Sequence, residues 1–101
     1  MDILGIDIGG TGIKGAPVHT EGGHLLAERY RVLTPSPSTP GDVADCIVEI
    51  AKHFEWDGRI GCGYPGVIKK GVTMTAANLD PSWIGINAKS LIEKKTRCKT
   101  T

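Results

Sequence analysis

The chain has 101 residues, which is enough for one small domain with a hydrophobic core. Twelve Lys and Arg residues balance 11 Asp and Glu residues, so no global charge favours nucleic acid or a membrane surface as a partner. The three cysteines lie far apart without a CxxC pair, which favours free thiols in a reducing cytosol over a metal site. No apolar run approaches the roughly 20 residues of a membrane span. We therefore expect a cytoplasmic protein that binds neither nucleic acid nor membranes, in which any anion site is local.

The first third of the sequence predicts three strands joined by short turns. Apolar runs at residues 3–8 and 13–18 flank a glycine-rich turn. Residues 25–33 follow a second glycine turn and mix aliphatic, aromatic and charged side chains, as a half-exposed strand does. Because the connections are short, we expect the three strands to form an antiparallel meander.

A proline-rich connection and a helix follow the predicted strands. Three prolines within residues 34–40 favour an extended surface segment. Thr39 is a candidate N-cap and Pro40 suits the first helical position, while apolar residues recur with helical spacing from Val43 to Phe54. This pattern predicts an amphipathic crossover helix.

The second half of the sequence predicts shorter elements. Residues 59–64 indicate a short buried strand, which ends at a Pro-Gly turn. A small hairpin is expected from residues 67–69 and 72–75, and a last helix over residues 88–95 begins after its N-cap Asn87.

The most unusual stretch is DIGGTGIKG, residues 7–15, in which four of nine residues are glycine. Gly10, Gly12 and Gly15 satisfy the dinucleotide fingerprint GxGxxG, but that motif requires a helix directly after the glycines. Here a proline, a second glycine turn and strand-like patterning follow, which excludes the dinucleotide interpretation. The P-loop pattern GxxxxGK[ST] fails as well, because Lys14 precedes Gly15.

Two interpretations of this glycine turn remain. It is either an ordinary hairpin turn with more glycine than two-residue turns need, or a cradle for phosphate oxygens. The backbone N–H groups of such a cradle would come from Gly9, Gly10, Thr11 and Gly12. Asp7 would repel a bare phosphate but suits one that carries Mg²⁺. The combination favours phosphoryl transfer.

Three segments, GIDIGGTGIKGA, GCGYPGV and TAANLDPSWIG, occur in an order and spacing that resemble the ROK (repressor, ORF, kinase) sugar kinases, most closely the bacterial polyphosphate/ATP glucokinases. The first segment is similar to the phosphate-1 hairpin of the actin/hexokinase superfamily. The resemblance implies an α/β fold of ribonuclease-H-like type, with the three-stranded antiparallel meander, the crossover helix and a parallel strand. Residues 1–101 would form the N-terminal lobe of a two-lobed sugar kinase.

The resemblance also implies the activity and the site residues. A phosphoryl group would pass from polyphosphate or ATP to the 6-hydroxyl of glucose, in a protein that is a homodimer at full length. Asp7 would act on Mg²⁺ directly or through water, and the Thr11 hydroxyl would join the loop backbone around the phosphoryl group. Lys14 either stabilises charge or is an ordinary solvent-facing lysine. Gly66 would lie against the sugar, and Asn78 would bind a sugar hydroxyl.

The catalytic aspartate of these kinases follows a later strand, which the resemblance places beyond Thr101. We therefore expect the 101-residue chain to be inactive alone. The outer edge of the strand at residues 59–64 would be unpaired, which favours self-association. Two other functions remain, a non-catalytic binding or assembly module and a transcriptional regulator of the ROK type. The regulator would need a DNA-binding helix-turn-helix ahead of the hairpin, where this chain has only Met1 and Asp2.

Overall fold

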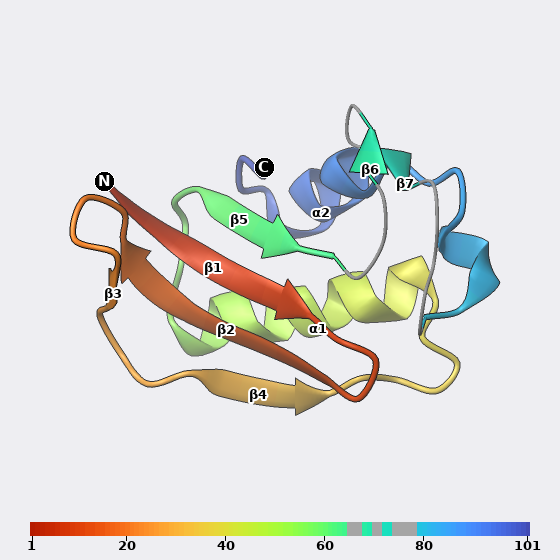
Figure 1. Cartoon of the computed structure of the whole chain (residues 1–101), viewed down its shortest axis with the longest axis horizontal. Helices are drawn as coiled ribbons and strands as arrows, with labels where there is room; N and C mark the ends of the chain where they lie inside the picture. Colours follow the sequence, from red (N-terminus) through yellow and green to blue (C-terminus); the bar gives the residue numbers. More distant parts are fainter. Residues whose placement is uncertain (65–67, 70–71, 74–78) are drawn as a thin grey trace.

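The computed structural model describes residues 1–64, 68–69, 72–73 and 79–101, and a mixed sheet is its central element (Figure 1). The middle strand β1 (Asp2–Ile8) pairs antiparallel with β2 (Gly12–His19) and parallel with β5 (Ile60–Gly63). Two further strands, β3 (His24–Leu25) and β4 (Tyr30–Leu33), pair antiparallel with β2. The α/β prediction with a mixed sheet is therefore confirmed.

The single strand predicted at residues 25–33 is wrong, because it is split into β3 and β4. Leu25 pairs with Val18 and Tyr30 pairs with Gly15, so four residues on one side face only Ala16 and Pro17 on the other. Pro17 has no N–H to donate to the ladder. The two extra residues on the side of β3 and β4 therefore form an irregular bulge that interrupts the pairing. The alternation of side chains gave no sign of this break.

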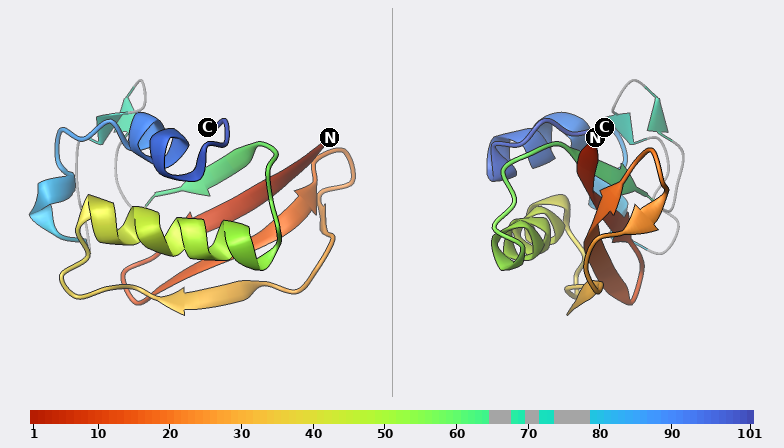
Figure 2. Two further views of the ribbon diagram at one scale, coloured as in Figure 1. Left: turned by 180° about the vertical axis from the view of Figure 1, so that it is seen from behind. Right: turned by 90° about the vertical axis from the view of Figure 1, so that its left-hand side faces the viewer.

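Both helices cover one face of the sheet, as the two turned views show (Figure 2). The helix α1 (Pro40–His53) begins after Thr39, whose hydroxyl accepts a hydrogen bond from the Asp42 N–H at 3.3 Å, as predicted. Its apolar stripe packs on the sheet, and α1, β1, β2 and β5 together provide the fully buried side chains Leu4, Ile13, Val43, Ile47, Ile50 and Ile60. The opposite face of the sheet is not covered by either helix (Figure 2).

The last part of the chain packs beside α1. The helix α2 (Ala88–Thr96) begins after the predicted N-cap Asn87, whose side chain accepts a hydrogen bond from the Ser90 N–H at 3.0 Å. A short 3₁₀-helix η1 (Pro81–Trp83) precedes it and buries Trp83 completely. The strands β6 (Ile68–Lys69) and β7 (Val72–Thr73) form a two-stranded ribbon, and the rest of the predicted hairpin lies outside the described residues. Within the described ranges, neither helix has the length and apolar character that a bilayer crossing requires.

The outer edge of β5 is paired, which corrects the expectation of an open edge. The Ile60 N–H donates to the Lys99 carbonyl at 2.7 Å, and the Thr101 N–H returns a bond to the Ile60 carbonyl at 2.9 Å. The Cys62 N–H donates to the Thr101 carbonyl at 3.0 Å, and the segment runs parallel to β5. Ladder bonds therefore begin at residue 99, and the apolar edge next to Ile60 is not free to pair with a second copy.

A chain that ends at Cys98 should associate more readily than the 101-residue chain. Removing residues 99–101 exposes the N–H and C=O groups of β5, which become a template for another chain. Light scattering over a concentration series should then detect dimers or larger species at lower concentration, while circular dichroism shows equal helix content. Identical association behaviour of the two chains would contradict the role assigned to residues 99–101.

Candidate functional site

The turn between β1 and β2 is closed by its own backbone. The Gly9 N–H donates to the Gly12 carbonyl at 3.0 Å, and a Cβ atom on Gly9 would lie 2.8 Å from that oxygen, so only glycine fits. The N–H groups of Gly10 and Thr11 have no hydrogen-bond acceptor among the described residues. The turn thus offers two adjacent unpaired donors, and the N–H of Gly9 is already used within the turn.

The other two glycines of the stretch serve packing. A Cβ atom on Gly15 would lie 2.6 Å from Ile6 Cδ1 and 2.7 Å from Ile50 Cγ2, so this glycine lets α1 approach the sheet. Gly12 lies beneath the Arg31 side chain, whose Cζ would be 2.7 Å from an added Cβ atom. The third glycine of the apparent GxGxxG pattern therefore belongs to the core, in keeping with the exclusion of a dinucleotide site.

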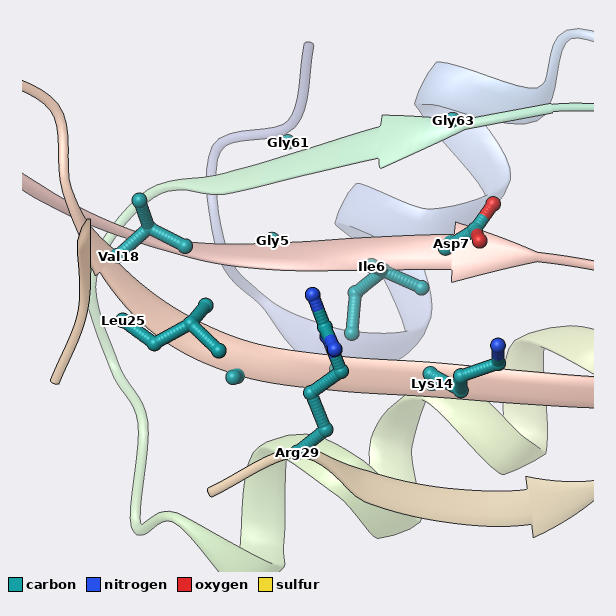
Figure 3. Close-up of a pocket in the computed structure, with 11 residues that line it drawn as sticks. Gly5, Ile6, Asp7, Lys14, Val18, Leu25, Arg29, Gly61 and Gly63 are labelled. Atoms are coloured by element: carbon teal, nitrogen blue, oxygen red, sulfur yellow. The ribbon is translucent and has the colours of Figure 1, made fainter. Parts of the chain in front are cut away.

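Asp7 and Lys14 lie directly opposite each other on β1 and β2, at the end of the sheet next to the glycine turn. Figure 3 shows both side chains on the face of the sheet away from α1. Asp7 is exposed, and no cationic side chain in the described ranges forms an ion pair with it. Its neighbour on β5 is Gly63, where a Cβ atom would lie 3.6 Å from Asp7 Oδ1. The missing side chain keeps that flank of the carboxylate open.

A cavity of about 550 Å³ extends from Asp7 along this face of the sheet (Figure 3). Its volume is in the range of small-molecule sites. Small residues form the floor, and Arg29 joins Lys14 at the side, so two cations accompany one carboxylate. Neither cation pairs with a carboxylate in the part of the chain that the structure describes. This charge arrangement suits an anion that carries a metal ion.

Two reactive side chains close to the sheet, Cys62 and Tyr64, have pKa values that burial raises. Burial raises the pKa of the Cys62 thiol to about 12, so the thiol stays protonated at neutral pH and is no nucleophile. Burial also raises the pKa of Tyr64, whose ring lies 5.1 Å from that of Trp83. Among the described residues, no three His, Cys, Asp or Glu side chains gather as a metal site would require.

The structure brings six of the eight predicted site residues together at one end of the sheet, namely Asp7, Gly9, Gly10, Thr11, Gly12 and Lys14. Gly66 and Asn78 lie outside the described residues. Sequence reasoning missed Arg31 and Thr34, whose side chains donate to the Thr11 and Gly9 carbonyls. Their distance from the turn in the sequence gave no signal of these contacts.

Comparison with known proteins identifies the family. The model of the ROK family matches residues 3–101, nearly the whole chain. The chain belongs to the ROK family. A polyphosphate glucokinase of Mycobacterium tuberculosis (strain ATCC 25177 / H37Ra) is 51% identical over 89 residues, which cover 88% of this chain and 34% of that protein. The chain thus spans about a third of the length of this relative.

Solved structures share the fold. The inorganic polyphosphate/ATP-glucomannokinase of Arthrobacter sp. strain KM superposes with a TM-score of 0.93 at 37% identity, over 99% of this chain and 42% of that protein. A ROK family glucokinase of Streptomyces griseus, solved in complex with glucose and AMPPNP, gives a TM-score of 0.83 at 26% identity over 100% of this chain and 32% of that one. The α/β fold of this chain, with its mixed sheet, is therefore that of the ROK sugar kinases.

Replacing Gly15 by alanine should destabilise the fold without touching the turn. The new methyl group must displace Ile6 or Ile50, and such overpacking costs about 1–3 kcal/mol. Thermal unfolding followed by circular dichroism measures the change, with Gly41→Ala as the control because no atom lies within 4 Å of an added Cβ atom there. Equal stability of the Gly15 and Gly41 variants would contradict the packing role.

Proposed function

We propose that this chain forms the N-terminal lobe of a glucokinase that transfers a phosphoryl group from polyphosphate or ATP to the 6-hydroxyl of glucose. The observation that carries the proposal is the turn with two N–H groups that have no acceptor among the described residues, beside an exposed carboxylate and an ammonium group. The names of the relatives support the same choice, since one is a polyphosphate glucokinase and another a polyphosphate/ATP-glucomannokinase.

The turn would bind the phosphoryl group that is transferred. The N–H groups of Gly10 and Thr11 would donate to its oxygens, and the Thr11 hydroxyl would add a third donor. Hydrogen bonds to a charged acceptor contribute roughly 1.5–3 kcal/mol each. Phosphoryl transfer is catalysed mainly by positioning and by stabilising charge on the phosphoryl oxygens. A rigid pair of backbone donors meets both requirements.

Asp7 fits the role of a magnesium ligand. Its carboxylate is exposed, is not neutralised by an ion pair within the described residues, and has open space beside it at Gly63. Mg²⁺ in such sites takes one or two carboxylates and completes its shell with water and phosphate oxygens. When bound, the ion would neutralise part of the donor's negative charge. Lys14, opposite Asp7, would add positive charge on the side of β2.

The sugar and the catalytic base would approach the same end of the sheet. We place glucose against Gly66 and Asn78, which follow β5 and β7 in the sequence. The segment at residues 99–101 runs parallel to β5, and β5 runs parallel to β1. Parallel strands bring their carboxyl ends to one edge, so residues that continue this strand would arrive beside Gly63, which is the neighbour of Asp7 on β5. We therefore place the catalytic aspartate beyond Thr101. We also propose that the complete enzyme is cytoplasmic and homodimeric.

Replacing Asp7 by alanine should abolish glucose phosphorylation in the complete enzyme while the fold is kept. The side chain is exposed, so the free energy of unfolding should change by no more than about 0.5 kcal/mol. A coupled assay of glucose 6-phosphate formation with polyphosphate and with ATP should show a loss of at least about 100-fold. Asp57→Ala removes another exposed carboxylate and should retain wild-type activity.

Two outcomes would count against the proposal in different ways. Near wild-type turnover by the Asp7 variant would remove Asp7 from the site. If the complete wild-type enzyme fails to phosphorylate glucose both with polyphosphate and with ATP, the proposed function is contradicted.

A further inference from the structure

We propose that Thr34 is a positioning residue that holds the backbone of the turn from the end of β4 and fixes the orientation of the Gly10 N–H. The proposed function assigns no role to this residue. The claim about the turn's conformation stands on contacts in the structure alone, while its consequence for the phosphoryl donor rests on the proposed function.

Thr34 forms two hydrogen bonds to the turn, although it lies 25 residues from Gly9 in the sequence. Its hydroxyl donates to the Gly9 carbonyl at 2.7 Å, and its backbone N–H donates to the Thr11 carbonyl at 3.2 Å. The two bonds hold carbonyl groups on either side of Gly10. One partly buried residue therefore holds both halves of the turn.

The bond from the Thr34 hydroxyl determines where the Gly10 N–H points. In a trans peptide the C=O of one residue and the N–H of the next lie in one plane and point in opposite directions. Among the described residues, the Ser36–Pro37 bond alone is cis, so the Gly9–Gly10 peptide is trans. Because Thr34 holds the Gly9 carbonyl, the Gly10 N–H must point away from Thr34. In the same way, the Thr34 N–H holds the Thr11 carbonyl, so the Gly12 N–H points away from Thr34.

Arg31 supports the same turn from the middle of β4. Its Nη2 atom donates to the Thr11 carbonyl at 3.4 Å, a longer bond than those of Thr34, and its guanidinium group covers Gly12. The bare backbone of Gly12 leaves the space that this side chain occupies. Arg31 is exposed, so it can be replaced with little risk to folding.

Glycine makes such external support necessary. Ordering one residue's backbone costs roughly 1–2 kcal/mol of conformational entropy, and glycine loses more than other residues. If nothing held the carbonyls, a phosphoryl group would have to order the turn when it binds, which weakens binding. Thr34 removes that cost in advance, so it acts on donor binding rather than on the sugar.

The decisive variants are Thr34→Val, which keeps the shape and removes the hydroxyl, and Thr34→Ser, which keeps the hydroxyl. Ser38→Ala is the matched control, because Ser38 lies in the same connection but its hydroxyl accepts from the Asp80 N–H, away from the turn. ¹⁵N relaxation on the 101-residue chain reports the order of Gly10 and Thr11. In the valine variant their order parameters should fall from about 0.85 to below about 0.6. The serine variant and the Ser38 variant should match the wild type.

Kinetics on the complete enzyme provide the second measurement. The valine variant should raise the KM for tripolyphosphate or ATP about five- to tenfold, the effect of losing the one hydrogen bond that the Thr34 hydroxyl makes. Its KM for glucose should stay within about twofold, and serine should restore the donor KM. A merely structural role would change both KM values together or neither.

The outcomes separate the inference from the proposed function. A folded valine variant with unchanged order at Gly10 and Thr11 overturns the inference. An inactive wild-type enzyme contradicts the proposed function, and the order parameters still decide the role of Thr34. If the valine variant does not fold, Thr34→Ala, which also removes the hydroxyl, takes its place, and unchanged order at Gly10 in that variant overturns the inference.

Discussion

The alternation of buried and open side chains along β1 is the constraint on which the site depends. Leu4, Ile6 and Ile8 must face α1 to be buried, and the period of two then places Gly5 and Asp7 on the uncovered face. A register slip of one residue would bury the Asp7 carboxylate and expose three core side chains. Burying the core thus sets the direction of the functional carboxylate without any contact to the carboxylate itself.

Three of the four glycines in the nine-residue stretch have separate roles in the structure, and those of Gly9 and Gly15 are steric requirements. Gly9 closes a tight turn, Gly12 accommodates the Arg31 side chain, and Gly15 lets α1 pack on the sheet. The only N–H groups of the turn that the described structure leaves without an acceptor and outside the strands are those of Gly10 and Thr11. The density of glycine therefore reflects packing and turn closure as much as phosphate binding, and the ligand-binding part of the stretch is its short tip.

Local rules predicted the elements that depend on local chemistry. The cap at Thr39, the apolar stripe of α1 and the start of α2 after Asn87 all follow from neighbouring residues, and the structure agrees with each. The break between β3 and β4 was missed because it depends on Pro17 in the neighbouring strand. Pairing of residues 99–101 with β5 and the bonds from Thr34 to the turn join segments far apart in the sequence, so periodicity and propensity carried no signal for them.

The tip of the β1–β2 turn should bind phosphate oxygens. Titration of the ¹⁵N-labelled chain with magnesium tripolyphosphate, followed by amide chemical shifts, tests it most directly. We expect saturable shifts that are largest at Gly10 and Thr11 and smaller at Lys14. Absence of saturable shifts at the turn, or shifts confined to the basic end of α2 at Lys94 and Lys95, would contradict it.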